Sequence, residues 1–89
     1  MRRWLRQRSL IWVVYKNWYV GVTNNPELRK RQHERRLGRQ VRHWCCWNTG
    51  RLRTARALEH YFGFHGKGMR GGKVQGNVQR DSTWIYVFK

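Results

Sequence analysis

Acidic side chains are scarce in this 89-residue chain, which has four Asp and Glu residues against twenty Lys and Arg residues. The formal net charge is +16 and the sequence pI is about 11.6. Self-repulsion at this density destabilises a compact state unless a polyanion neutralises it. The charge, together with 15% aromatic residues, fits a protein that binds DNA or RNA. A ribosomal-protein-like chain has the same composition, so charge alone does not separate the two classes.

The sequence also has few of the features of secreted and membrane proteins. Its two cysteines, Cys45 and Cys46, are adjacent and cannot easily pair with each other, which favours a reducing, cytoplasmic setting. No apolar segment follows the double arginine near the start, so we interpret residues 1–8 as a basic arm and not as an export signal. No apolar run approaches the length of a membrane span.

The length allows one domain, which we expect to span residues 1–89. Two short β-branched and aromatic runs, 10–15 and 18–22, flank Lys16-Asn17 and predict a tight hairpin. A helix should follow, with Asn25 as its N-cap and Pro26 at its first position. We expect it to run to about Leu37 and to stop at Gly38.

The second half of the chain predicts two further strands, 41–47 and 83–88, on either side of a helix. Apolar residues at helical spacing from Leu52 to Phe62 define that helix, with Thr49 as its cap and Gly63 as its end. Residues 63–76 contain six glycines and read as a basic loop. The predicted fold class is α/β (α+β), with a small, mainly antiparallel sheet of three to four strands flanked by helices.

The most informative segment is 18–33, which reads as a strand, a capped turn and a helix. Tyr19-Val20-Gly21 resembles the YIG half of the GIY-YIG nuclease motif. Arg29 and His33, one helical turn apart, are similar in order and spacing to the arginine and histidine that follow that motif. Further along, the segment 55–59 resembles the helix that carries the family's metal-binding glutamate, here Glu59. Gly76-Asn77 lies where the family has a late asparagine.

The resemblance implies a role for each of these residues. Glu59 would hold one Mg²⁺ or Mn²⁺ ion, and Arg29 would bind the scissile phosphate. Tyr19 would take a proton from water as general base or orient that water, and His33 would hydrogen-bond the tyrosine or help to move the proton. Asn77 would position a water or a helix end. This set matches what phosphodiester hydrolysis requires, namely an activated nucleophile and stabilisation of the charge at phosphorus.

The first half of the motif departs from the pattern, because no GIY sequence precedes Tyr19. If Lys16-Asn17 is a two-residue turn, period-two alternation places Tyr15 on the face opposite Tyr19. A three-residue loop instead sets Tyr15 beside Tyr19. Either Tyr15 supplies the first hydroxyl, or Trp12 stands in its place without one.

Each residue also has a plainer interpretation. Tyr19 fits an ordinary sheet position, and Arg29 and His33 fit a solvated helix face. Glu59 borders the apolar stripe, where an unpaired carboxylate is costly to bury, but it can pair with Arg56. Asn77 fits a turn. His43, His60, His65 and the two cysteines could form a zinc site, although their spacing follows no standard finger.

We therefore predict a minimal GIY-YIG endonuclease that cleaves nucleic acid, with double-stranded DNA as the expected substrate, and the compactness of the chain suggests a phage or mobile-element protein. The alternative is a binding module of the same fold that does not cleave. The arm and the glycine-rich loop supply the expected nucleic-acid-binding residues, which are Arg2, Arg3, Lys67, Arg70 and Lys73. With no room for a separate recognition domain, selectivity would come from these segments, from a homodimer or from a partner protein.

Overall fold

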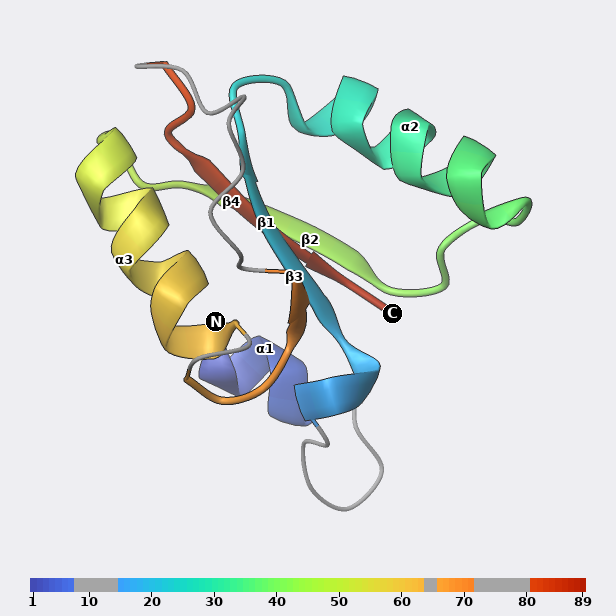
Figure 1. Cartoon of the computed structure of the whole chain (residues 1–89), viewed down its shortest axis with the longest axis horizontal. Helices are drawn as coiled ribbons and strands as arrows, with labels where there is room; N and C mark the ends of the chain where they lie inside the picture. Colours follow the sequence, from blue (N-terminus) through green and yellow to red (C-terminus); the bar gives the residue numbers. More distant parts are fainter. Residues whose placement is uncertain (8–14, 64–65, 72–80) are drawn as a thin grey trace.

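The computed structural model describes residues 1–7, 15–63, 66–71 and 81–89, and shows a small α+β fold built on a four-stranded sheet (Figure 1). The strands are β1 (Tyr19–Thr23), β2 (Trp44–Asn48), β3 (Arg70–Gly71) and β4 (Trp84–Phe88). The helices are α1 (Arg2–Gln7), α2 (Pro26–Leu37) and α3 (Leu52–Phe62), together with a short 3-10 helix, η1 (Tyr15–Asn17).

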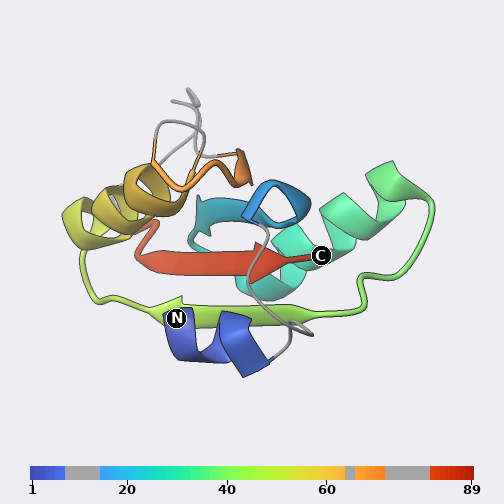
Figure 2. The ribbon, with the colours of Figure 1, turned by 90° about the horizontal axis from the view of Figure 1, so that it is seen from below.

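The sheet has the strand order β2-β4-β1-β3 and is mixed. The last strand of the chain, β4, lies at the centre and pairs antiparallel with both β1 and β2. The short strand β3 runs parallel to β1 at the edge. The predicted α+β class is confirmed, while the strand directions are not purely antiparallel. Figure 2, seen from below, shows β2 and β4 running side by side.

The predicted hairpin around Lys16-Asn17 is wrong. These residues belong to η1, and Trp18 N–H donates to the Tyr15 carbonyl to close its turn. The partners of β1 are instead β4 and β3, which lie far from it in the sequence. β4 pairs with one edge of β1 and β3 with the other, so at Tyr19 and Val20 neither edge is left for a hairpin partner. Most of the predicted first strand, and Trp12 with it, lies outside the described residues.

Helix α2 begins and ends as the sequence predicts. The Asn25 side chain accepts a hydrogen bond from Leu28 N–H at 3.1 Å, and Pro26 occupies the first helical position. Gly38 adopts a left-handed conformation with φ of 71°, and its N–H donates to the Glu34 carbonyl. The helix buries only His33, so this side chain is its main contact with the sheet.

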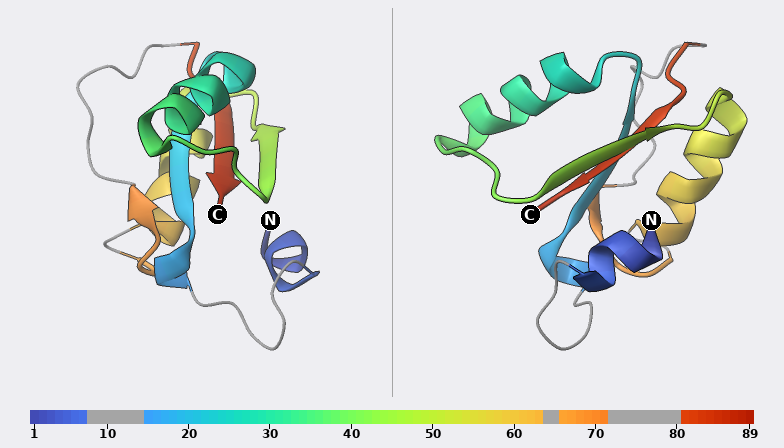
Figure 3. Two further views of the ribbon diagram at one scale, coloured as in Figure 1. Left: turned by 90° about the vertical axis from the view of Figure 1, so that its right-hand side faces the viewer. Right: turned by 180° about the vertical axis from the view of Figure 1, so that it is seen from behind.

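Helix α3 packs on the other face of the sheet and completes the core. Its predicted stripe is confirmed, since Ala55 and Phe62 are buried and Leu58 packs against the core. Thr49 is not its cap, because the N-cap is Arg51 and the Thr49 hydroxyl instead bonds the Arg51 and Thr83 carbonyls. The left view of Figure 3 shows α2 in front of the sheet and α3 behind it.

The predicted basic arm contains the helix α1. Leu5 is fully buried among Trp18, Val20 and Val87, which anchors α1 on the α3 side of the sheet. Of the predicted glycine-rich loop, the described part holds β3 and lies against α3 through the Lys67 N–H bond to the Tyr61 carbonyl. None of the helices in the described part of the chain is long and apolar enough to cross a membrane.

Candidate active site

Tyr19, His33 and Tyr86 meet on the sheet face that α2 covers. The ring centroids of Tyr19 and His33 are 4.8 Å apart, and His33 Nε2 lies 2.8 Å from the Tyr86 hydroxyl oxygen. The Tyr19 and Tyr86 rings are nearly parallel, at 11°, with centroids 6.4 Å apart. These side chains come from β1, α2 and β4, so segments from both ends of the chain build one cluster.

Gly21 makes room for Tyr86. The two residues are directly opposite each other in the β1–β4 ladder, so their side-chain positions share one face of the sheet. A Cβ atom at position 21 would collide with the hydroxyl and ring of Tyr86. The glycine of the Tyr19-Val20-Gly21 motif therefore lets the Tyr86 ring lie flat across β1.

We expect Gly21→Ala to destabilise the protein by about 1–3 kcal/mol, as overpacking of a filled site does. Denaturant unfolding measures this change in the free energy of unfolding. In a Tyr86→Ala background the obstructing ring is gone, and the same substitution should be neutral or slightly stabilising, because glycine is unfavourable within a strand. An equal cost in both backgrounds would show that Tyr86 is not what requires glycine at this position.

The hydrogen bonds of His33 define its tautomer. Arg36 Nη2 lies 2.9 Å from His33 Nδ1. A guanidinium only donates hydrogen bonds, so Nδ1 must accept, and in the neutral ring the proton sits on Nε2. Nε2–H then donates to the Tyr86 oxygen. The hydroxyl hydrogen of Tyr86 is left to point away from His33.

The protonation states of the cluster follow from burial and nearby cations. Burial lowers the pKa of His33 to about 4, and the positive charges of Arg36 and Arg29 add to this effect. His33 is therefore neutral at pH 7. Burial also raises the pKa of Tyr86, with Tyr19 and Glu59 contributing and Arg29 and Arg36 opposing. Tyr86 is thus a neutral phenol at pH 7, and His33 serves it as a hydrogen-bond donor.

The charges of Arg29 and Glu59 act on this cluster, that of Arg29 from α2 and that of Glu59 from α3. Arg29 is half-buried on α2, and its charge acts on both His33 and Tyr86. Glu59 is half-buried on α3, and its charge also acts on Tyr86. Burial raises the pKa of the Glu59 carboxyl, while attraction to Arg56 opposes the rise. Arg56, the partner that the sequence predicts for Glu59, is present, but burial affects the Glu59 pKa more than the Arg56 charge does.

The other three acidic residues have different positions. A Glu34 carboxylate oxygen accepts a hydrogen bond from Val41 N–H at 3.0 Å. Asp81 accepts from the Asn24 amide, and Glu27 lies in the first turn of α2. Within the described ranges, no three His, Cys, Asp or Glu side chains come close enough to hold a metal ion.

Tyr15 lies away from the cluster. It packs against the core on the α3 side, with its ring centroid 6.2 Å from that of Phe62. The arrangement with Tyr15 beside Tyr19 is therefore not found. Asn77 and Lys73 lie outside the described residues, as does His65.

The sequence does not identify Tyr86 as a site residue, because the motif order predicts the first tyrosine ahead of Tyr19. The signal was present in Ile85-Tyr86 of the last predicted strand, where Trp84, Tyr86 and Phe88 alternate with Ile85 and Val87. Tyr86 stacks on Trp44 of β2 at 4.9 Å, and Tyr19 stacks on Phe88 at 5.0 Å. A row of aromatic rings thus crosses this face of the sheet.

Comparison with known proteins returned no matching family model, no matching curated protein and no matching solved structure.

Proposed function

We propose that this protein is a metal-dependent endonuclease of the GIY-YIG type, with double-stranded DNA as its expected substrate. One observation carries the proposal: Tyr19, His33 and Tyr86 meet at hydrogen-bond and ring-contact distances, although they come from three separate segments. Arg29 and Glu59, both expected at such a site, act electrostatically on Tyr86. If His33 were only a solvated helix residue and Tyr19 only an ordinary sheet residue, nothing would require these three side chains to meet.

In the proposed arrangement, the strand that carries the first tyrosine of the motif comes last in the chain instead of first. β4 lies antiparallel to β1 and places Tyr86 opposite Gly21, one residue beyond the middle of the Tyr19-Val20-Gly21 motif. The missing GIY segment near residue 12 is then no defect. Tyr86 supplies the second hydroxyl, and Tyr15 has a structural role in the core.

The reaction is attack of water on phosphorus, with loss of a water proton and cleavage of one bond from phosphorus to an ester oxygen. Tyr19 takes that proton while its own hydroxyl proton passes to solvent, or it orients the water and solvent takes the proton. The leaving ester oxygen takes up a proton from solvent. Arg29 binds the phosphate oxygens and stabilises the negative charge that grows on them. Tyr86, a neutral phenol, donates its hydroxyl hydrogen toward the reacting groups. The Tyr86 oxygen meanwhile accepts a hydrogen bond from His33 Nε2–H.

Glu59 is the residue that would hold a divalent cation. Mg²⁺ typically binds one or two carboxylates and keeps several waters beside substrate phosphates, so a single half-buried carboxylate fits it. A cation would also offset the burial that raises the pKa of Glu59. When bound, the metal neutralises charge on the phosphate or the leaving oxygen.

The direct test is incubation of purified protein with supercoiled plasmid. We expect nicked or linear product with Mg²⁺ or Mn²⁺, and none after excess EDTA. DNA binding should persist in EDTA, because the basic residues and not the metal supply most of the affinity. Binding without cleavage under any divalent metal would instead favour the non-catalytic binding module. Cleavage that continues in EDTA would exclude the proposed role of the metal.

A further inference from the structure

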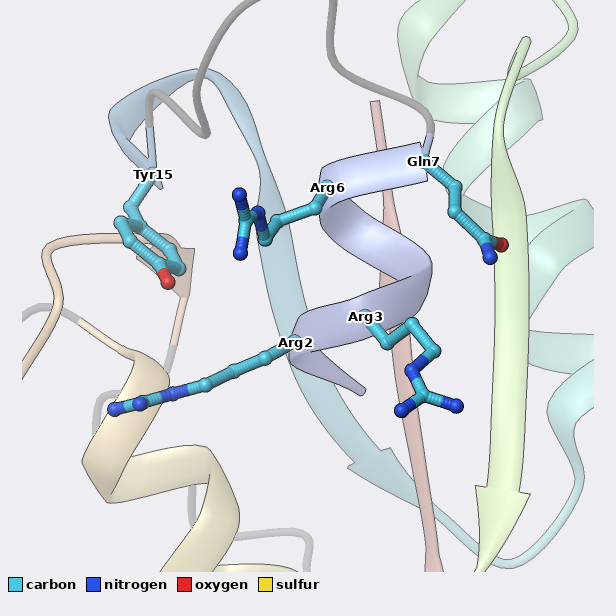
Figure 4. Close-up of a pocket in the computed structure, with 5 residues that line it drawn as sticks. All are labelled: Arg2, Arg3, Arg6, Gln7 and Tyr15. Carbon is cyan, nitrogen blue, oxygen red and sulfur yellow. The ribbon is translucent and has the colours of Figure 1, made fainter.

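A basic surface lies on the α1 and α3 side of the sheet, away from the tyrosine cluster. The described residues that line a hollow of about 560 Å³ there are Arg2, Arg3, Arg6, Gln7 and Tyr15. Figure 4 shows Arg2 and Arg6 extending from the same side of α1, with the Tyr15 ring beyond them. Hollows of this size are in the range that binds small ligands and parts of larger ones.

Positive charge gathers in this hollow without a matching negative charge. The first turn of α1 contains no acidic residue and carries Arg2 and Arg3. Arg2 and Arg6 are one turn apart, where like charges repel. Among the described residues that line the hollow, none carries a carboxylate. An anion from outside would relieve this repulsion.

Packing against the core fixes the two segments that line the hollow, and further basic side chains lie next to it. Leu5 fixes α1 in the core, and Tyr15 is fixed against Phe62. The Arg2 guanidinium lies over the Tyr61 ring at 5.1 Å, and Lys67 lies over the same ring at 5.5 Å. Basic side chains from α1 and from the segment after α3 are thereby gathered on one side of the molecule.

We infer that Arg2, Arg6 and the Tyr15 hydroxyl form a binding site for a backbone phosphate of a DNA strand, separate from the cleavage site. Guanidinium groups bind phosphate oxygens through charged, often bidentate hydrogen bonds, and a tyrosine hydroxyl adds a neutral donor. The inference rests on the proposed nucleic-acid partner but not on cleavage. It identifies one face of the molecule as the position of DNA flanking the reacting phosphate.

The test measures binding of a fluorescent DNA duplex in EDTA at several salt concentrations. Arg2→Gln/Arg6→Gln should lower the slope of log affinity against log salt by about one unit, because both side chains serve one phosphate. The matched control is Arg31→Gln/Arg35→Gln, two exposed arginines one turn apart on α2, which should change the slope far less. Equal changes for both pairs would show general charge attraction and overturn the inference.

An NMR titration of the wild-type protein keeps the test independent of the variants' folding. A short duplex should shift the Tyr15 ring signals and the Arg2 and Arg6 side-chain N–H signals, and absence of these shifts would count against the site. Vesicles of phosphatidylglycerol serve as a second probe. If α1 governs binding to vesicles and not to DNA, the partner is a lipid surface and the inference is wrong. The binding measurements are made without metal and do not depend on cleavage. If the protein binds DNA through α1 but never cleaves it, this site stands and only the proposed nuclease activity is wrong.

The geometry independently points to Arg36 as a positioning residue for the cleavage site, an inference that rests on the proposed function. Its guanidinium donates to His33 Nδ1 at 2.9 Å and lies 5.7 Å from the centre of the Tyr19 ring. By occupying Nδ1, it keeps the His33 proton on Nε2, where it faces the Tyr86 oxygen. Without this donor, the other tautomer becomes available and removes the hydrogen bond to Tyr86.

The readout is the ¹⁵N spectrum of the His33 ring at neutral pH. Wild-type protein and Arg36→Lys, which keeps a donor, should show protonated Nε2 and unprotonated Nδ1. Arg36→Met should show a mixture of tautomers and at least a tenfold slower single-turnover cleavage. Arg35→Met removes the neighbouring exposed arginine and leaves the Arg36–His33 hydrogen bond in place, so it is the matched control and should change neither. An unchanged tautomer in Arg36→Met would overturn the inference, whether or not the protein cleaves DNA.

Discussion

Glu59→Gln should abolish cleavage while leaving DNA binding intact. Glutamine keeps the size and shape of the side chain, so the half-buried position on α3 stays filled. What it removes is the negative charge that would hold the divalent cation. We expect a loss of at least a hundredfold in the single-turnover rate, which corresponds to about 2.7 kcal/mol of transition-state stabilisation.

The control for this substitution is Glu34→Gln. Glu34 lies on α2, and its carboxylate accepts a hydrogen bond from Val41 N–H, so it belongs to the helix end and not to the tyrosine cluster. Cleavage should remain near the wild-type rate in this variant. Plasmid cleavage and duplex binding, measured on the same preparations, separate the two effects. Normal turnover by Glu59→Gln would remove this residue from the mechanism.

Arg29→Ala should reduce cleavage far more than binding. The chain has twenty basic residues, so the loss of one phosphate contact should lower the salt slope of binding by about one unit at most. The developing charge at the scissile phosphate has no such redundancy, because in the proposed arrangement Arg29 is the residue that stabilises it, and the Arg29 charge acts on both His33 and Tyr86. We expect a rate loss on the order of a hundredfold or more.

Arg31→Ala is the matched control for Arg29→Ala. Arg31 is exposed and lies on the same helix, two residues further along, so both variants lose one positive charge from α2. Salt-dependent binding and single-turnover cleavage should be measured for each. If Arg29→Ala loses binding and rate in equal proportion, Arg29 is an ordinary phosphate contact and not part of the reacting site.

Local signals made α2 and α3 predictable from the sequence. Asn25, Pro26 and Gly38 act on residues next to them, so the bounds of α2 follow from capping chemistry alone. The stripe from Leu52 to Phe62 likewise defines α3 through helical spacing. The placement of His33 on the buried side of α2 could not be read this way, because it depends on the aromatic rings of strands β1 and β4.

Strand pairing was the part that the sequence did not reveal. The run 83–88 reads as a strand, but period-two alternation does not identify its neighbours. Nearness in the sequence favoured a hairpin before Tyr19, whereas β4 pairs with β1 across more than half the chain. Tyr86 was missed for the same reason. Its fit over Gly21 is a tertiary contact that no local pattern contains.

The measurement that tests the account most directly is single-turnover cleavage by three tyrosine-to-phenylalanine variants under identical conditions. Tyr86→Phe and Tyr19→Phe each remove a hydroxyl from the cluster around His33, and both should slow cleavage by at least tenfold while the proteins remain folded and bind DNA. Tyr15→Phe removes a hydroxyl on the other side of the sheet and should cleave at close to the wild-type rate, with only a modest loss in binding. Normal cleavage by Tyr86→Phe together with a severe loss in Tyr15→Phe would contradict the account, because the first tyrosine of the site would then come from the start of the chain and not from β4.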